Sequence, residues 1–338
     1  MTTQREQSIH NWITTVLDSH QFEIHFLAGD ASFRRYARIK LDNKTFMLMD
    51  APPDKEDCVP FVTIDEFFDQ NGVRVPHIIA KDFTQGFLLL EDFGDTLIST
   101  LLNDMTVDRY YQQSFKQLIQ LQSIEDQLRL PDYCYEKLIA EMNLFTDWML
   151  PSLAIQLTDD QAALLKRTFA ILANAAVAQP QVIVHRDFHS RNLMKIEDEE
   201  NLGIIDFQDA VIGADTYDLI SITRDAYVQW PSERVEQWFA LFYEMLPNTA
   251  KEHRDFNQFK KEADFMAVQR HLKILGIFVR LFERDGKAGY LKDLPRVMWY
   301  VLEESQPYVE LKAFVEFMHE IVLPKFAAKY GQYEVLQA

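Results

Sequence analysis

A short stretch of the chain places three oxygen-bearing side chains at a spacing that suits phosphoryl transfer. Asp187 and Asn192 stand in one polar loop with four residues between them, and Asp206 follows the apolar run 203–205. Phosphoryl transfer requires a group that accepts the proton of the attacking hydroxyl, and oxygen ligands that hold Mg²⁺ on the phosphates. The pattern therefore predicts Asp187 as the base, and Asn192 and Asp206 as the metal ligands.

Three apolar runs predict the strands that position this loop. They lie at 182–184, 193–196 and 203–205, with an acidic turn at 197–201 between the last two. A plain polar hairpin capped by Asp and Asn would share part of the pattern, because an isolated H-x-D is common by chance. The complete series H-x-D-x-H-x-x-N, followed after a strand and a turn by I-D-F, is far more specific and favours a kinase-like centre.

These residues resemble the core of the aminoglycoside phosphotransferase and choline kinase group. The resemblance is carried by His185, Asp187, His189, Asn192 and Asp206. Protein kinases usually have Lys two residues after the base, and Phe-Gly after the metal-binding Asp. Here His189 stands at the first position, Gln follows Phe at the second, and no later A-P-E occurs. The differences favour a kinase that acts on a small molecule.

Longer stretches are similar to the bacterial cell-wall sugar kinases. They read H-R-D-F-H-S-R-N-L-M, I-D-F-Q-D-A and T-Y-D-L-I-S-I-T-R-D, and the similarity extends from Asp30 to Asp285. This family transfers phosphate from ATP to the anomeric hydroxyl of N-acetylmuramate and N-acetylglucosamine, which implies a role in peptidoglycan recycling. The resemblance implies that His185 and Asp218 position the loop. Candidates for the substrate-binding wall are His189, Arg191, Gln208, Asp209 and Arg224.

The nucleotide is expected to bind in the first part of the chain. A turn at 29–32 stands where a kinase cradles phosphates with backbone N–H groups. The residues expected to contact the phosphates are Ser32, Phe33, Arg34 and Arg35. The run L-L-L-E-D-F-G at 88–94 resembles a kinase hinge, where adenine would bind the backbone near Glu91 and Phe93.

The third predicted strand, 45–50, departs from the kinase pattern. A kinase has a lysine here that holds the α- and β-phosphates, whereas this chain has Met47 and Met49. The cations that could replace it are Arg34, Arg35, Arg38 and Lys44. Without a strand lysine to pair with, Glu66 of the following helix is expected to be an ordinary surface residue.

A helix predicted over 264–284 has a buried seam made by Val268, Leu272, Leu275, Val279 and Phe282. Lys273, Arg280 and Arg284 fall on a neighbouring face and are interpreted mainly as a solvated basic edge. A sharper alternative is that Arg280 faces the cleft and meets an anionic group of the substrate. Further upstream, T-D-D-Q at 158–161 predicts the start of another helix.

Length and composition set the remaining bounds. The 338 residues are 48% hydrophobic with a formal net charge of −18, which argues against a nucleic-acid-binding surface. Two cysteines make no metal or disulfide pattern, and no apolar stretch resembles a signal region or membrane span, so a cytoplasmic protein is expected.

The predicted fold is a two-lobed, kinase-like α+β structure. A small β-rich lobe spans 1–93 and a mainly helical lobe spans 94–338, in an expected monomer.

Three functions remain open on the sequence. The first is the anomeric amino-sugar kinase, with ATP and Mg²⁺ as cofactors. The second is another small-molecule kinase of the group, acting on an aminoglycoside, choline or homoserine. The third is a pseudokinase that binds nucleotide or a partner without catalysis. The absent strand lysine favours the pseudokinase, whereas the intact Asp187, Asn192 and Asp206 argue against it.

Overall fold

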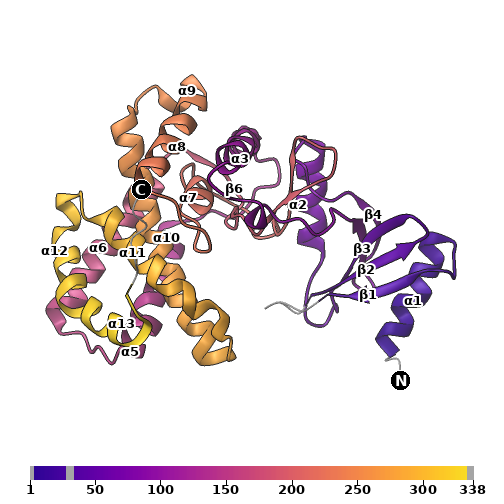
Figure 1. The fold of residues 1–338 in the computed structure, drawn as a ribbon, viewed down its shortest axis with the longest axis horizontal. Helices are drawn as coiled ribbons and strands as arrows, with labels where there is room; N and C mark the ends of the chain where they lie inside the picture. The colour runs from indigo at the N-terminus through magenta and orange to yellow at the C-terminus, as the bar shows by residue number, and fades with distance from the viewer. Residues whose placement is uncertain (1–3, 28–33, 333–338) are drawn as a thin grey trace. The chain divides into compact units, whose positions relative to one another are not determined.

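The computed structural model describes residues 4–27 and 34–332, and their contacts divide the chain into two compact units (Figure 1). The N-terminal unit comprises residues 1–100 and 192–208, and the C-terminal unit comprises residues 101–191 and 209–338. The hairpin at 192–208 thus packs with the N-terminal unit, although the chain reaches it from the C-terminal one. The lobe boundary near residue 93 stays a prediction.

A five-stranded antiparallel sheet forms the centre of the N-terminal unit. The strands are β1 (Glu23–Phe26), β2 (Arg35–Leu41), β3 (Lys44–Asp50), β4 (Ile78–Asp82) and β5 (Phe87–Glu91), in the order β1-β2-β3-β5-β4. Helix α1 (Gln4–Leu17) packs Ile9 and Ile13 against inward-facing residues of the sheet, among them Ile39 and Leu48. The alternation of strand side chains gives this packed face, and the predicted third strand, 45–50, is confirmed by β3.

Helix α2 (Val59–Gln70) and the hairpin of β7 (Leu193–Lys195) and β8 (Leu202–Ile204) complete the N-terminal unit, with the short η1 (Ile98–Thr100). The ring of Phe207 packs against Phe61 and Phe68 of α2, with ring centroids 4.9 and 5.9 Å away. Pairing of Leu193 with Ile204 brings the residues on either side of the hairpin together. The residue just before β7 and the residues just after β8 are therefore held at one end of the hairpin.

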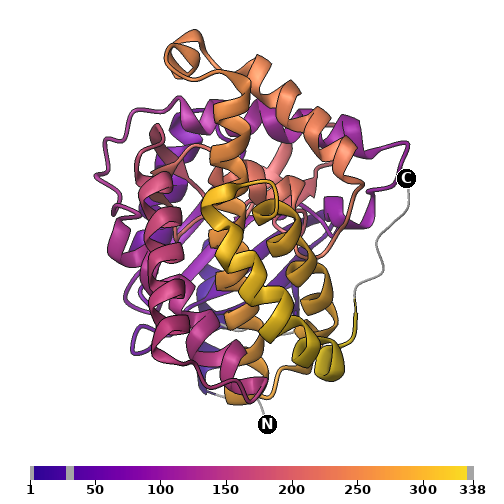
Figure 2. The same ribbon diagram turned by 90° about the vertical axis from the view of Figure 1, so that its left-hand side faces the viewer.

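The C-terminal unit is mainly helical and is organised around the 30-residue helix α10 (Phe256–Asp285) (Figure 2). Its other elements are α3 (Val107–Gln122), α4 (Tyr135–Leu144), η2 (Phe145–Met149), α5 (Leu150–Ser152), α6 (Asp159–Val177), β6 (Gln181–Val184), β9 (Val211–Ala214), α7 (Tyr217–Thr223), α8 (Ser232–Met245), α9 (Asn248–Lys251), η3 (Ala288–Asp293), α11 (Leu294–Ser305), η4 (Val309–Leu311), α12 (Lys312–Phe317), η5 (Met318–Val322) and α13 (Leu323–Tyr330). The first predicted catalytic strand is β6, and it pairs with β9, a strand that the sequence analysis missed.

The predicted seam of α10 is confirmed over most of its length. Val268, Leu272, Leu275 and Val279 are fully buried, whereas Phe282 is 37% exposed, so its predicted burial is wrong. The helix start at 158–161 is confirmed as well, because Thr158 and Gln161 form a capping box at the beginning of α6.

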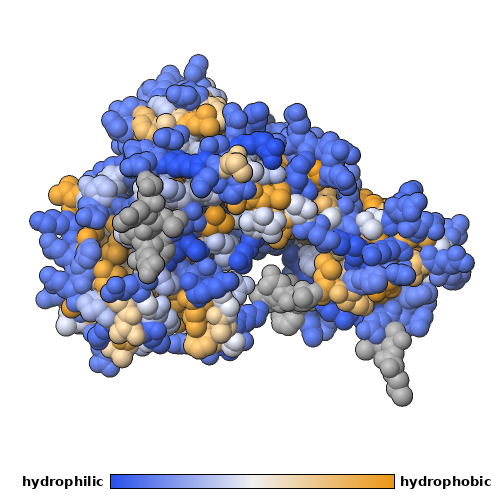
Figure 3. Space-filling view, in the orientation of Figure 1, coloured by the Kyte–Doolittle hydropathy of each residue, from blue (hydrophilic) through white to orange (hydrophobic). Residues whose placement is uncertain are grey.

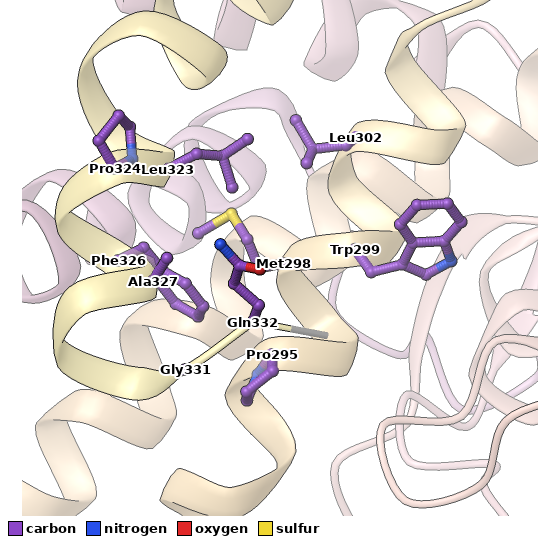
Figure 4. A pocket seen from close by; sticks show the side chains of 10 residues that line it. All are labelled: Pro295, Met298, Trp299, Leu302, Leu323, Pro324, Phe326, Ala327, Gly331 and Gln332. Atoms are coloured by element: carbon purple, nitrogen blue, oxygen red, sulfur yellow. The ribbon is translucent and has the colours of Figure 1, made fainter. Parts of the chain in front are cut away.

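An apolar hollow of about 380 Å³ lies between α11 and α13 and is lined by Met298, Leu302 and Phe326, among others (Figure 4). No titratable side chain lines it, so it offers no group for acid–base chemistry. The visible surface is mostly hydrophilic, with apolar residues in scattered groups (Figure 3). No helix in the described part of the chain combines the length and the apolar character that crossing a membrane requires.

Gly276 permits a close approach between α10 and α4. A Cβ placed on Gly276 would lie 2.3 Å from the carbonyl carbon and oxygen of Leu144, which are backbone atoms that cannot swing aside. The absence of a side chain is therefore required by packing rather than by an unusual backbone conformation.

We expect Gly276→Ala to destabilise the protein, although alanine usually favours a helix by about 1 kcal/mol over glycine. Forcing the two helices apart should cost about 1–3 kcal/mol, as overpacking of a core typically does. The measurement is the urea midpoint of unfolding followed by circular dichroism. Arg284→Ala is the control on the same helix, because that side chain is 56% exposed and pairs with the adjacent Asp285. An unchanged or higher midpoint for Gly276→Ala would show that the crossing can relax.

Candidate active site

A buried carboxylate supports the catalytic loop from behind. Asp218 of α7 is fully buried and accepts hydrogen bonds from the backbone N–H groups of His185 at 2.6 Å and Arg186 at 3.0 Å. Burial raises the pKa of Asp218 to about 7, although both hydrogen bonds act to lower it. The bracing contact expected for Asp218 is therefore present.

Further contacts fix the loop between β6 and β7. Arg186 has a left-handed backbone with φ of 76°, which is strained for a residue with a side chain. Its guanidinium donates to Glu141 at 2.8 Å, so the strained residue is also anchored through its side chain. The backbone N–H of Asp187 donates to Nδ1 of the buried His185 at 3.2 Å, so this histidine contacts the loop from within, and its positioning role stays a prediction. Ser190 donates its N–H and hydroxyl to Asp225, at 2.9 and 2.5 Å.

The charge state of Asp187 depends on nearby cations. Burial alone would raise the pKa of this carboxyl, but the positive charges of Lys273, His189 and Arg270 lower it below its ordinary value. The carboxylate is consequently ionised at neutral pH, which is the state in which it can accept a proton from a hydroxyl group.

Lys273 is not part of a solvated edge, so that prediction is wrong for this residue. Its side chain is 12% exposed, lies 3.2 Å from a carboxylate oxygen of Glu141 and donates to the hydroxyl of Tyr217 at 3.1 Å. The Glu141 carboxylate and the rings of Tyr133 and Tyr217, 5.9 and 5.7 Å from the ammonium group, offset the cost of burying it. The sequence analysis missed Arg270 and Glu141. A run of polar residues inside a long apolar helix was the available signal for Arg270 and Lys273.

The predicted metal ligands lie in the N-terminal unit at the end of the hairpin. The side-chain amide of Asn192 lies 3.3 Å from one oxygen of Asp206, and the amide of Gln208 donates to the other oxygen at 2.8 Å. Asp206 has a left-handed backbone with φ of 67°, which is again a strained conformation. Two polar amides thus hold the single carboxylate in a fixed orientation.

The donor set fits Mg²⁺ better than a metal ion whose ligands all come from protein side chains. No group of three or more His, Cys, Asp or Glu side chains capable of holding a metal occurs within 4–27 and 34–332. Magnesium commonly uses one or two protein carboxylates and completes its shell with water and phosphate oxygens. The carboxylate of Asp206 and the amide oxygen of Asn192 satisfy that requirement.

Two of the four predicted phosphate contacts, Ser32 and Phe33, lie outside the described residues. Arg34 is described, and its guanidinium lies 2.7 Å from a carboxylate oxygen of Glu56. Arg35 binds the fully buried Asp50 through Nε at 2.9 Å. Asp50 also accepts a hydrogen bond from the guanidinium of Arg5 in α1 at 2.6 Å. Arg35 therefore belongs to a group of ion pairs that connects α1 to the sheet.

Ion pairs also fix the predicted hinge. Arg74 donates to Glu91 at 2.6 Å and to Glu199 at 2.8 Å, and its guanidinium lies 4.6 Å from the centre of the Phe93 ring. A side chain at Gly203 would come within 2.4 Å of that ring, so the glycine makes room for Phe93. The hinge backbone is thus held between β5 and β8, although the structure does not test the predicted adenine contacts.

The predicted substrate residues fall in different surroundings. In the C-terminal unit, His189 and Arg191 both pack against Tyr227, at 5.4 and 3.5 Å from the centre of its ring. Gln208 supports Asp206 in the N-terminal unit, and Asp209 is exposed. The substrate contacts of all these residues, and of the partly buried Arg280, stay predictions.

Arg224 has a structural explanation that the sequence analysis did not foresee. It is 6% exposed, forms a salt bridge with Glu303, and lies 3.5 Å from the buried Glu304. These contacts account for a buried arginine without a substrate, because they neutralise its charge.

Comparison with known proteins assigns the family. The model of the phosphotransferase enzyme family matches residues 23–256, well over half of the chain. The chain belongs to the phosphotransferase enzyme family. The resemblance indicated by the catalytic motifs is thereby confirmed, and the protein is a kinase-type enzyme.

Members of the phosphotransferase family with curated functions are similar over most of their length. The N-acetylmuramate/N-acetylglucosamine kinase of Pseudomonas putida is 40% identical over 296 residues, which cover 87% of each chain. The protein of the same name from Neisseria meningitidis serogroup B is 36% identical over 326 residues, covering 94% of this chain and 96% of the relative. Among solved structures, an ethanolamine kinase of Plasmodium vivax aligns with a TM-score of 0.60 at 13% identity, covering 85% of this chain and 83% of the other. This likeness confirms the predicted kinase-like α+β fold.

We expect Lys273→Met to make phosphoryl transfer more sensitive to acid. Removing the ammonium group raises the pKa of Asp187, because burial is then opposed by fewer positive charges. The ratio of kcat/KM in the variant to that in the wild type should fall as the pH decreases from 7.5 to 5. Lys261→Met, on the same helix and paired with Glu310, is the control, and its ratio should stay constant. A constant ratio for folded Lys273→Met would remove this lysine from the control of Asp187.

Proposed function

We propose that this phosphotransferase is an ATP-dependent sugar kinase that acts on the anomeric hydroxyl of N-acetylmuramate or N-acetylglucosamine. The observation that carries the proposal is the 40% identity, over 87% of each chain, to a relative named N-acetylmuramate/N-acetylglucosamine kinase. The product is the sugar 1-phosphate, and the role is the return of cell-wall sugars to metabolism in peptidoglycan recycling. A cytoplasmic location fits this role and the two free cysteines, Cys58 and Cys134.

In the proposed reaction, Asp187 accepts or orients the proton of the attacking hydroxyl. An anomeric hydroxyl is more acidic than other sugar hydroxyls because the ring oxygen withdraws electrons, so an ionised carboxylate of low pKa suffices as the base. Correct placement of the hydroxyl and stabilisation of charge supply most of the remaining rate. The contacts of Asp218, Glu141 and Asp225 fix the loop that carries Asp187, so the base is held in place for the hydroxyl.

On the nucleotide side, the backbone near Glu91 and Phe93 is proposed to bind adenine. Asp206 and Asn192 are proposed to hold Mg²⁺, which when bound neutralises charge on the phosphate oxygens. The amide of Gln208 keeps the Asp206 carboxylate oriented. Arg186 and Asp206, two of the residues with a left-handed backbone, mark positions where the backbone is strained next to these groups.

The charge near Asp187 argues against an aminoglycoside as the acceptor. An aminoglycoside carries several positive charges and would be met by carboxylates, whereas the charges that lower the pKa of Asp187 belong to basic groups, Lys273, His189 and Arg270 among them. N-acetylmuramate carries a carboxylate, which suits a site with nearby cations. Arg191, stacked on Tyr227, and Arg280 are the candidates to meet that carboxylate.

The experiment incubates each sugar with enzyme, ATP and Mg²⁺ and follows the reducing end. Phosphorylation at carbon 1 must abolish reducing-sugar reactivity, and the 1-O-methyl glycoside must be inert. Aminoglycosides and choline complete the panel. A product that keeps its reducing end, or phosphorylation of the methyl glycoside, would show that the enzyme is a sugar kinase that acts on a hydroxyl other than the anomeric one.

We expect Asp187→Asn to lower turnover about 10²–10⁴-fold while the fold survives, because the general base is lost. Near-normal turnover would remove Asp187 from that role.

A second prediction separates the two metal ligands. We expect Asp206→Ala to reduce ATP turnover more than Asn192→Ala does, because a carboxylate neutralises the ion whereas an amide offers only a dipole. Turnover is measured over a Mg²⁺ titration, with Glu200→Ala as the control, because Glu200 is an exposed carboxylate of the same hairpin. Normal turnover of Asp206→Ala at ordinary Mg²⁺ would show that the metal is held elsewhere.

A further inference from the structure

The position of the kinase strand lysine is filled by an apolar side chain. Met49 of β3 is fully buried and pairs across the sheet with Tyr36 of β2. The hydroxyl of Tyr36 lies 3.5 Å from the sulfur of Met49. A cation that replaces the lysine must therefore reach this place from another part of the N-terminal unit.

Three of the four candidate cations are engaged or distant. Arg35 is held by Asp50, and Arg38 is held by Asp92 at 2.6 Å and by Asp95 at 2.7 Å. Lys44 pairs with Leu41 at the opposite end of β3. It stands five residues from Met49, about 17 Å along an extended strand at about 3.4 Å per residue.

Arg34 is the remaining candidate, and it lies beside Tyr36, the residue that contacts Met49. Its side chain is 11% exposed and binds Glu56 at 2.7 Å. It also hydrogen-bonds the hydroxyl of Tyr36, and the charge of Asp206 acts on the same hydroxyl. Arg34 therefore lies at the buried hydroxyl that is 3.5 Å from the sulfur of Met49, and the charges of Glu56 and the proposed metal ligand Asp206 act on that hydroxyl.

The partner of this arginine differs from that of a kinase lysine. In protein kinases the strand lysine pairs with a glutamate of the following helix. The glutamate of that helix here, Glu66, is about half exposed and binds Lys81 at 2.5 Å, so the expectation of a surface residue is confirmed. Glu56, which precedes α2, binds the arginine instead. Compared with the strand lysine and helix glutamate of protein kinases, both the cation and the anion of this ion pair come from different positions in the sequence.

We propose that Arg34, held by Glu56 and Tyr36, supplies the positive charge for the α- and β-phosphates of the nucleotide in place of the strand lysine. The inference rests on the proposed use of ATP, but not on the identity of the sugar. A guanidinium can donate two parallel hydrogen bonds to a phosphate, so it need not occupy the lysine position itself.

Nucleotide binding without any sugar tests the proposal. Calorimetry with Mg·ADP and with adenosine separates a phosphate contact from an adenine contact. Arg34→Met should weaken ADP about 10- to 100-fold, the effect of losing a charge-assisted bond worth about 1.5–3 kcal/mol, and leave adenosine unchanged. Arg34→Lys should fall between, because it keeps the charge but loses the planar fork. Lys44→Met is the control and should bind ADP as the wild type does.

A relocated charge distinguishes the proposal from a general loss of structure. The double variant that combines Arg34→Met with Met49→Lys should bind ADP at least tenfold more tightly than Arg34→Met does. Met49→Lys alone should bind ADP no more tightly than the wild type. ADP binding by Arg34→Met at wild-type strength would overturn the proposal, as would improved ADP binding by Met49→Lys alone. If Arg34→Met does not fold, Glu56→Gln and Arg34→Lys decide instead. Unchanged ADP affinity in both would contradict the proposal. ADP binding with no sugar phosphorylation would refute the proposed acceptor alone.

Discussion

The buried carboxylate of Asp218 is the constraint on which the catalytic loop depends. It accepts the N–H groups of two consecutive residues, the second of which is the strained Arg186. A strained backbone of this kind costs about 1–3 kcal/mol and persists only where its surroundings determine it. Without the carboxylate, two donors behind the loop would lose their partners at about 1–3 kcal/mol each. The shape of the loop and the placement of Asp187 therefore rest on a side chain that contacts no reactant.

Helix packing in the C-terminal unit also sets the electrostatics of Asp187. Gly276 lets α10 meet α4 at the backbone of Leu144. Three residues earlier on each helix, Lys273 meets Glu141, and Glu141 in turn anchors Arg186 of the catalytic loop. One close helix crossing thus holds the cation that lowers the pKa of Asp187 and the anion that fixes the loop. Core packing and proton acceptance are linked through these four positions on α4 and α10.

Local signals explain which elements could be predicted from the sequence. The capping box of Thr158 and Gln161 acts over three residues, and the hairpin that ends at Asp206 is defined by a short turn between two apolar runs. By contrast, β9 is four residues long and pairs with β6 about 30 residues away, so no local pattern marks it. The burial of Lys273 depends on Glu141, more than 130 residues earlier in the chain. The residue types needed for chemistry were evident, whereas the charged groups that tune them depend on contacts between distant segments.

The N-terminal unit shows how a strongly acidic chain distributes its arginines. Arg5 and Arg35 share the fully buried Asp50, Arg38 joins Asp92 to Asp95, and Arg74 joins Glu91 to Glu199. Each of these groups ties strands, a helix or the hinge together.

An arginine in such a group cannot turn toward a phosphate without leaving a carboxylate unpaired, at about 3–5 kcal/mol for a buried pair. Glu56 is different from Asp50, because its side chain is 22% exposed. Water can solvate Glu56 when its arginine shifts toward another anion, so the energetic penalty is smaller there than at Asp50. Arg35 and Arg38 each have a buried carboxylate partner, Asp50 and Asp92, whereas the partner of Arg34 is partly exposed, and this difference separates Arg34 from the other two candidate arginines.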